Sequence, residues 1–260
     1  MSVAVVANPE IERKLNLDKP YEASDFPNMP EEYKELLLHQ LKVQASIEGQ
    51  NLYRVRLSGL SLEEIVELIP EDEWVFRMKE YRLLADEVNH GYISIKLLAD
   101  LGFNITKADF PEDADLGISF ANQSLEDWVD LALAHFLTDI IGHFACGDWR
   151  HATYGPLARA GARIARDEQG HFRLGYQMVN RLLELGRGED LRVRLYDKWW
   201  PVALDGFGRS DTKRQWRYIE WGIKQHSNQQ LREMYITKMT PVVEKLGFDV
   251  PPSDHNRMVR

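Results

Sequence analysis

The chain has 260 residues, a net charge of −9 and 44% hydrophobic residues. Its length lies in the range of one large domain, and its apolar content is enough for a sizeable core. The negative charge argues against a general nucleic-acid binder, because phosphate contacts need clustered Lys and Arg. Its single cysteine, Cys146, excludes an iron–sulfur cluster or a disulfide framework held by this chain alone.

We expect no membrane span, because no apolar run approaches the roughly 20 residues that a bilayer requires. The first residues, MSVAVVANPEIERKL, lack a basic segment followed by a long apolar core, so we expect no signal peptide. These patterns predict a cytoplasmic protein that binds neither a membrane nor a nucleic acid.

Residues 1–29 are mostly polar and contain three prolines, so we expect an extended N-terminal arm followed by a single domain over residues 30–260. A helical pattern begins at Pro30, which makes a good first turn with the two glutamates after it. A second helix is expected after the acidic segment LIPEDEW, and Gly102 in LADLG is its stop signal.

The second half of the chain predicts two further long helices. One is SLEDWVDLALAHFLTDIIGHFACGDW, which opens at Ser124 with Asp127 three residues later, a weak capping signature. The other is GPLARAGARIARDEQGHFRLGYQMVNRLLELG. Beyond it we expect a short helix and a loop, then helices broken near Ser227–Asn228 and before Pro241. No strand pattern of useful length is present, so the class is all-α: a four-helix bundle with additional C-terminal helices.

Two Glu-x-x-His pairs, Glu87–His90 and Glu168–His171, lie on the second and fourth of these long helices. Residues three apart on a helix lie one turn apart, so both side chains of a pair can reach one metal ion. One pair is weak evidence, because such spacings arise by chance on solvated helices, whereas two pairs on two helices are much more specific. Ferritin-like di-iron proteins have this arrangement, with one carboxylate added by each of the other two helices.

The helix before each pair supplies one inward acid. Glu48 lies on the apolar row of the first long helix, and Asp139 lies among apolar residues in AHFLTDIIGHF. An unpaired acid there would be costly to bury, and coordination to a metal would remove that cost. His135 and His143 share a helix face with Asp139, and we interpret them as supporting or core residues in preference to ligands.

The predicted ligands of two iron ions are therefore Glu48, Glu87, His90, Asp139, Glu168 and His171. Four carboxylates and two imidazoles neutralise two divalent irons and leave open positions for dioxygen. An aspartate precedes the glutamate of each pair, and we expect Asp86 and Asp167 to orient a histidine on a neighbouring helix. The competing interpretation is that the six are surface or capping residues.

Several stretches resemble the catalytic A subunits of bacterial multicomponent phenylacetyl-CoA monooxygenases, the ring 1,2-epoxidases. The resemblance runs from about residue 28 to residue 254 and includes ADEVNHG, FLTDIIGHF and ATYGPLARAGARIARDEQGHFRLG. It also includes the tail WGIKQHSNQQLREMYITKMTPVVEKLGFDVP, which a generic di-iron bundle does not require. The order of the six ligands is also that of this family.

The resemblance implies a ferritin-like di-iron enzyme of phenylacetate catabolism. It would insert one atom of dioxygen into the ring of an aryl-CoA thioester and reduce the other atom to water. It also implies a separate flavin and iron–sulfur reductase and a ferritin-like structural partner, and therefore a hetero-oligomer. Two alternatives stay open: a di-iron oxygenase or hydroxylase with another substrate, and a non-catalytic ferritin-like scaffold protein.

Overall fold

The structure is a computed structural model that describes residues 12–106 apart from 16, 55 and 58, residue 109, and residues 123–259 apart from 211. Residues 1–11 of the expected N-terminal arm lie outside this part of the chain. The remainder of the arm contains a 3₁₀ helix, η1 (Ala23–Asn28), where we expected extended chain. The amide of Tyr21 donates to the carbonyl of Thr153 at 2.8 Å, which attaches the arm to the body of the fold.

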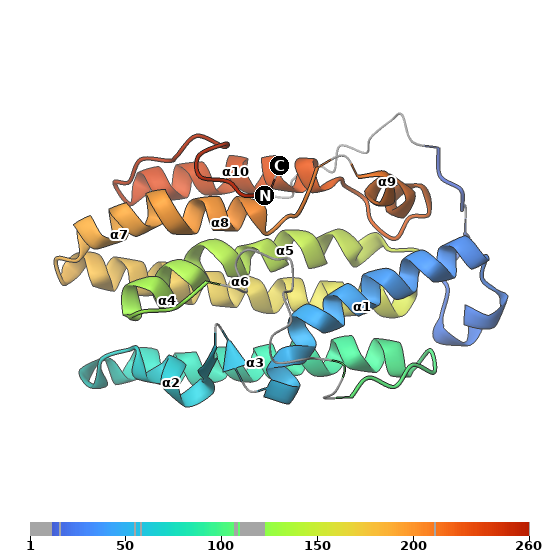
Figure 1. Cartoon of the computed structure of the whole chain (residues 1–260), viewed down its shortest axis with the longest axis horizontal. Coiled ribbons are helices and arrows are strands. Elements are labelled where there is room, and N and C mark those ends of the chain that lie inside the picture. Colours follow the sequence, from blue (N-terminus) through green and yellow to red (C-terminus); the bar gives the residue numbers. More distant parts are fainter. Residues whose placement is uncertain are drawn as a thin grey trace.

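The fold is all-α, as the sequence predicts, and its centre is a ferritin-like bundle of four long helical segments. They are α1 (Glu31–Arg54), α3 (Trp74–Ala99), the joined helices α4 (Trp128–Ala134), η5 (His135–Asp139) and α5 (Ile140–Gly147), and α6 (Gly155–Glu184). Figure 1 shows α4, α5 and α6 running lengthwise through the middle of the molecule, with α3 below them. Helix α1 packs along α3 and crosses the bundle obliquely.

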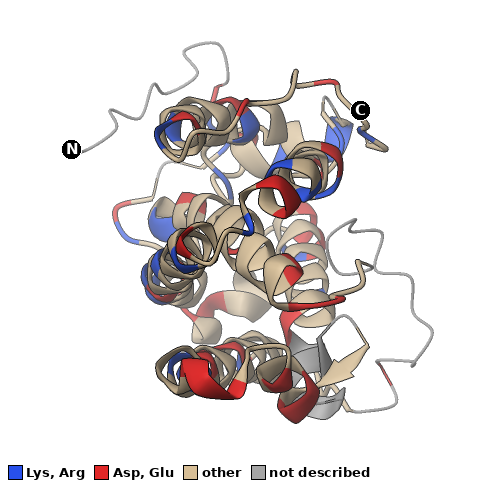
Figure 2. Ribbon diagram, turned by 90° about the vertical axis from the view of Figure 1, so that its left-hand side faces the viewer, with Lys and Arg blue, Asp and Glu red and all other residues tan. Residues whose placement is uncertain are grey.

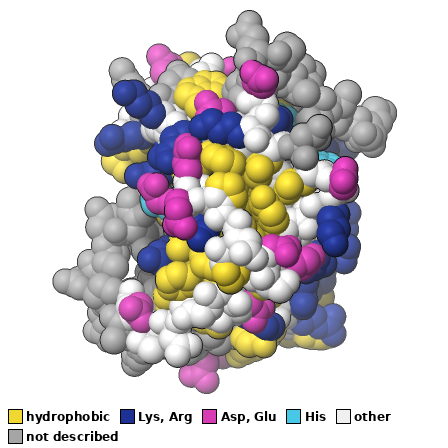
Figure 3. All heavy atoms as spheres, turned by 90° about the vertical axis from the view of Figure 1, so that its right-hand side faces the viewer, with side chains coloured by type: hydrophobic (Ala, Val, Ile, Leu, Met, Phe, Trp, Pro, Cys, Tyr) yellow, Lys and Arg dark blue, Asp and Glu magenta, His cyan; other side chains and the backbone are white. Residues whose placement is uncertain are grey.

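Shorter elements surround this bundle. They are β1 (Arg56–Leu57), β2 (Leu60–Ser61), α2 (Leu62–Glu67), η2 (Glu71–Glu73), η6 (Asp148–His151), α7 (Gly188–Arg194), η7 (Leu195–Trp199), α8 (Trp200–Asp205), α9 (Lys213–Glu220) and α10 (Asn228–Lys245). Helices α7, α8 and α10 form a layer on the far side of α4–α5 from α3 (Figure 1), and these are the additional C-terminal helices that the sequence predicts. Figure 2 shows acidic and basic residues distributed over several helices, and Figure 3 shows both signs side by side on one end of the molecule.

The buried apolar residues form two clusters that meet within α6. Ile164 packs with residues of α1 and α5, while Leu174 packs in the cluster that α4, α8 and α10 share. Glu168 and His171 lie between these two residues along the helix, and both are buried. Polar side chains are therefore enclosed in the middle of the bundle, where a carboxylate needs a partner to remain charged.

Two glycines let α6 approach the joined helices α4–α5 very closely. A β-carbon at Gly175 would lie 2.3 Å from the amide nitrogen of Phe136, and one at Gly161 would lie 2.4 Å from the carbonyl oxygen of Cys146. Any side chain at either position would collide with backbone that cannot move independently. These contacts fix the spacing between the helix that carries Glu168 and the helix that carries Asp139.

The third long helix contains a π-helical segment, η5, between α4 and α5. Such segments often mark functional sites, because the wider turn changes the direction in which side chains leave the helix. Asp139 is the last residue of η5. The spacing pattern of the sequence predicts a regular α-helix here and gives no sign of the wider turn.

The joined helices from Trp128 to His151 are, among the described residues, the one segment long and apolar enough to cross a membrane. The sequence pattern predicts no apolar run of that length. In the fold, 61% of the most apolar window of this segment is buried inside the protein, as in the core helix of many soluble proteins. Its composition is therefore weak evidence for a membrane span.

Three local predictions are wrong in detail. The helix cap is Asp127 in place of Ser124: its carboxylate accepts from the amide of Val129 at 2.9 Å and from that of Asp130 at 3.2 Å. Helix α10 begins at the Ser227 cap, as expected, but continues through Pro241. Residues 191–208, expected to be a short helix and a loop, are helical as far as Asp205 in α7, η7 and α8, so the helical part is longer than expected.

Candidate metal centre

The two Glu-x-x-His pairs face each other across the interior of the bundle, and each histidine reaches the glutamate of the other pair. The Nδ1 atom of His171 on α6 lies 3.1 Å from Oε1 of Glu87 on α3. Conversely, Nδ1 of His90 lies 3.6 Å from Oε1 of Glu168. The two histidine rings are 5.8 Å apart between centroids. Helical spacing alone places the members of each pair on one face, and the packing of α3 against α6 brings the pairs together.

The aspartates that precede these glutamates lie behind the histidines of the opposite helix. His90 donates from Nε2 to Oδ2 of Asp167 at 3.2 Å, and Nε2 of His171 lies 3.6 Å from Oδ2 of Asp86. A proton held on Nε2 by a carboxylate leaves the lone pair of Nδ1 directed into the centre, as a metal ligand requires. The placement is therefore reciprocal, with an aspartate of each run behind the histidine of the other. The hydrogen bond itself is made only by Asp167, since Asp86 lies 3.6 Å from a ring nitrogen of His171 that has no hydrogen bond to the described residues.

Glu48 joins this group from α1. The buried residues Leu37, Leu41 and Ala45 follow one row along α1, and Glu48 continues that row one turn further. Its Oε1 accepts a hydrogen bond from Nε2 of Gln44 at 3.0 Å. The apolar row thus carries a carboxylate to the same depth in the bundle as the histidines on α3 and α6.

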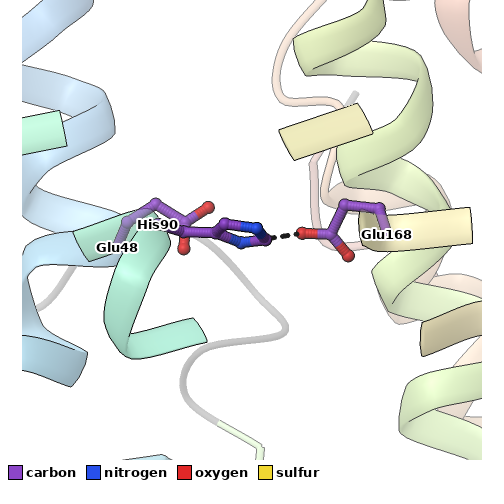
Figure 4. A group of neighbouring side chains, drawn as sticks. All are labelled: Glu48, His90 and Glu168. Carbon is purple, nitrogen blue, oxygen red and sulfur yellow. Dashed lines mark ion pairs between the residues drawn. The ribbon is translucent and has the colours of Figure 1, made fainter. Parts of the chain in front are cut away.

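Two sets of side chains bring their ligand atoms within 4.8 Å of one another, and Glu168 belongs to both. One is Glu48, His90 and Glu168, and the other is Glu87, Glu168 and His171. Figure 4 shows the first set, with the ring of His90 and the carboxylate of Glu168 pointing toward each other from facing helices. If two metal ions were bound, Glu168 is the residue that could contribute to holding both of them.

Asp139 does not belong to either set. Its Oδ2 accepts a hydrogen bond from Nδ1 of His135 at 2.7 Å. It lies near the centre nonetheless, because its charge is one of the influences that raise the pKa of Glu168. Five of the six predicted ligands thus converge in the described structure, and the sixth lies beside them with one oxygen engaged by a histidine.

The sequence interpretation missed Glu80. This residue lies on α3 two turns before Glu87, is completely buried, and places Oε1 3.0 Å from Nε2 of His135. The available signal was its spacing of seven residues from Glu87, which puts both carboxylates on one helix face. The other candidate on the third helix, His143, faces α6: its Nδ1 donates to the carbonyl of Ala165 at 2.8 Å.

The charges in this enclosed group are unbalanced. Burial raises the pKa of Glu48 well above its ordinary value, and the charges of Glu87 and Glu168 add to that effect. Burial and the charge of Glu87 likewise raise the pKa of Glu168 to about 8. Burial would raise the pKa of Glu87 also, but contact with His171 outweighs it and lowers that pKa.

His171 carries the compensating charge. Burial opposes a charge on its ring, but the carboxylates of Glu168 and Glu87 outweigh it and raise the pKa of His171 to about 12. Protons on His171 and Glu168 therefore balance an excess of buried carboxylates. Divalent cations would do the same and would displace those protons, because metal ligands bind deprotonated.

The donor set fits a pair of metal ions. Nδ1 of His90 and both ring nitrogens of His171 are buried and make no hydrogen bond of normal geometry to the described residues, although carboxylate oxygens lie 3.1–3.6 Å from them. Buried polar atoms without partners are uncommon in native folds, and an ion is one of the ordinary explanations. Carboxylates and imidazoles in this combination suit divalent iron with positions left for dioxygen. Residues Glu48, Glu87, His90, Glu168 and His171 have the chemistry and the proximity to hold such ions, with Asp139 next to them.

The family model of the Phenylacetic acid catabolic protein matches residues 85–258, about two thirds of the chain. The chain belongs to this family. It is also 28% identical over 264 aligned residues to the A subunit of the 1,2-phenylacetyl-CoA epoxidase of Escherichia coli (strain K12). That alignment covers 94% of this chain and 77% of the relative.

The match to the Phenylacetic acid catabolic protein family includes both Glu-x-x-His pairs and the C-terminal helices. It begins two residues before Glu87 and continues past the end of α10. Glu48 and the arm lie outside the family match but inside the length over which the likeness to the epoxidase protein extends. The family resemblance expected from the sequence is thereby confirmed.

Proposed function

We propose that this chain is the catalytic component of a di-iron monooxygenase that inserts one atom of dioxygen into the ring of an aryl-CoA thioester such as phenylacetyl-CoA. The observation that carries the proposal is the reciprocal arrangement of the two Asp-Glu-x-x-His runs, with Glu168 common to both ligand groups. The likeness to an epoxidase component over 94% of the chain supports the oxygenase activity and the substrate class.

The proposed ligands of the two irons are Glu48, Glu87, His90, Asp139, Glu168 and His171. When bound, the iron pair supplies the redox chemistry that activates dioxygen, which amino-acid side chains cannot supply. The chain itself orients one donor by a hydrogen bond: Asp167 holds His90 in the tautomer with a free Nδ1. Asp86 lies behind His171 at 3.6 Å, without a hydrogen bond. Burial of Glu168 and His171 excludes water from the centre and keeps the donors from being solvated.

Electrons for this reaction come from outside the chain in our proposal. Insertion of one oxygen atom leaves the other to be reduced to water, which consumes two electrons per turnover. The single cysteine, Cys146, is buried and cannot hold an iron–sulfur cluster. We therefore expect a separate flavin and iron–sulfur reductase. The relative is the A subunit of an epoxidase, which supports an assembly with further subunits. We expect one of them to be a ferritin-like structural partner.

The test is to purify the protein with its ferritin-like partner, count the bound iron, and supply reductant, ¹⁸O₂ and a series of aryl-CoA thioesters. We expect two irons per chain and one ¹⁸O atom in the product of a thioester. Turnover only with a substrate that lacks CoA would contradict the proposed substrate class and favour a di-iron oxygenase with another substrate. Two irons without any oxygenation would favour the non-catalytic scaffold protein.

A matched pair of variants tests the ligand assignment itself. Glu168→Ala removes the carboxylate common to both groups, so we expect loss of tight binding of both irons and of turnover. Glu184→Ala removes an exposed glutamate at the end of the same helix, where it contacts Arg181, and is expected to change neither. Two tightly bound irons in the Glu168→Ala protein would contradict the assignment.

A further inference from the structure

A chain of three side chains leads away from the proposed centre through His135, from the partly buried Asp139 to the fully buried Glu80. Its Nδ1 donates to Oδ2 of Asp139 at 2.7 Å, and its Nε2 lies 3.0 Å from Oε1 and 3.1 Å from Oε2 of Glu80. Asp139 and His135 are the ends of η5, whereas Glu80 comes from α3. The imidazole thus links the π-helical segment to the helix that carries the first Glu-x-x-His pair.

Both ring nitrogens of His135 lie within hydrogen-bond distance of carboxylate oxygens, one on each side of the ring. Glu80 is 0% exposed, and His135 is the one ion-pair partner that the described residues give it. A buried carboxylate with a single partner fixes that partner firmly, because release would leave the charge uncompensated.

The contact with His135 orients the carboxylate of Asp139. With Oδ2 held by His135, Oδ1 is the oxygen that remains for an ion at the centre. Orientation of a ligand carboxylate by a hydrogen bond from behind commonly sets metal affinity and the mode of binding. Asp139 is also the proposed ligand that stands outside the two converging groups, so its position depends most on what holds it.

We propose that His135 and Glu80 are positioning residues that present Asp139 to one of the two irons through a single oxygen. The inference rests on the proposed di-iron function and adds two residues to it. His135 does not touch the metal in this scheme; it acts through the hydrogen bond to Asp139. Glu80 acts one step further away, by holding the imidazole between α3 and η5.

Two substitutions of His135 separate its two hydrogen bonds. The amide nitrogen of asparagine takes the position of Nδ1, so His135→Asn keeps a donor for Asp139 and loses contact with Glu80. The amide nitrogen of glutamine takes the position of Nε2, so His135→Gln keeps a donor for Glu80 and loses the one to Asp139. The matched control is the same pair of substitutions at His143, which lies two turns on and bonds to Ala165 and Gln169 in place of Asp139.

The full-length metal-free protein is titrated with Co²⁺, a spectroscopic substitute for Fe²⁺, and bound ions are counted by equilibrium dialysis. We expect His135→Gln to lower the affinity for one of the two ions by about 10- to 100-fold and to change the visible absorption of the Co²⁺ form of the protein. The His135→Asn protein is expected to keep both ions and a spectrum close to wild type. Both His143 variants are expected to match the wild-type protein.

Glu80→Gln is a second test variant, used if His135→Gln fails to fold. It keeps the shape of the side chain and removes the charge. We therefore expect a smaller loss of affinity for the same ion than in His135→Gln, and a change in the same absorption bands. Wild-type affinity and spectrum in both His135→Gln and Glu80→Gln would overturn the positioning role. So would equal losses in His135→Asn and His135→Gln. A wild-type protein that binds no pair of ions would instead refute the proposed di-iron function, which the titration shows before any variant is compared.

Discussion

Gly142 lies directly against the side chain of Glu168: a β-carbon at position 142 would be 2.8 Å from both Cγ and Cδ of that glutamate. Gly142 follows Asp139 by three residues on the same helix. Because Gly142 has no side chain, there is space beside it, and the carboxylate of Glu168 on α6 occupies that space. This carboxylate is the one that both ligand groups share. The two helices therefore cooperate at this carboxylate, one by supplying it and the other by leaving room for it.

Gly142→Ala is predicted to impair metal binding without unfolding the protein. The added methyl group displaces the Glu168 carboxylate, while alanine improves the intrinsic helix propensity by up to about 1 kcal/mol. We expect weaker binding of both ions in the Co²⁺ titration and a circular dichroism spectrum like that of wild type. The control is Gly170→Ala on α6, where a β-carbon meets no described atom within 4 Å. Unchanged affinity in the Gly142 variant would show that Glu168 moves without consequence.

The two aspartates behind the histidines are predicted to be unequal. Asp167 makes a 3.2 Å hydrogen bond to His90 and is 24% exposed in its side chain, whereas Asp86 lies 3.6 Å from His171 and is 51% exposed. Solvent screens the more exposed carboxylate. Asp167→Ala should therefore lower metal affinity by about 10- to 100-fold, and Asp86→Ala by less. The reverse order, measured by dialysis against Co²⁺, would contradict the geometry.

Gly175→Ala is predicted to destabilise the fold. Its β-carbon would lie 2.3 Å from the backbone nitrogen of Phe136, so α6 and η5 must separate. Overpacking of this kind costs typically about 1–3 kcal/mol of unfolding free energy. Urea unfolding of the metal-free protein measures this cost directly. The Gly170→Ala variant again serves as control, and equal midpoints for the two proteins would show that the helices can adjust.

Acid should weaken a buried network around Asp130, away from the metal centre. Burial would raise the pKa of Asp130, but hydrogen bonds from Trp199, Lys198 and the amide of Glu126 outweigh it and lower that pKa below 3.8. A carboxyl with a depressed pKa in the folded state adds stability above its unfolded pKa and loses it as the pH falls through the folded value.

Asp130→Asn tests whether the stability that Asp130 contributes is lost as the pH falls. The amide keeps an acceptor for Trp199 but loses the charge that Lys198 and Arg194 contact, so we expect a loss of about 1–3 kcal/mol near neutral pH. The difference from wild type should shrink as the pH falls below 3.8, the ordinary pKa of the group. Urea unfolding of both proteins at several pH values measures it. A difference that grows toward acid would show that Asp130 is not stabilised as a carboxylate.

Spacing along the chain is enough to establish the long helices and the two Glu-x-x-His pairs, since both depend on one continuous segment. Apolar residues at helical spacing predict α1, α3 and α6 closely, and the same period places Glu87 with His90 and Glu168 with His171. It also led to Glu48, because that residue continues the buried row of α1. Local features that depend on competing contacts were less predictable: Asp127 caps its helix partly because Arg194, distant in sequence, holds it at 2.8 Å.

How these residues meet became known only from the packing of the helices. Which aspartate lies behind which histidine depends on the contact of α3 with α6, which local periodicity does not encode. The π-helical turn before Asp139, the space that Gly142 leaves, and the contact of Glu80 with His135 across 55 residues depend on helix packing in the same way. A buried charge is stable only with its partner, and that partner is set by the distance between helices, not by the order of residues along them.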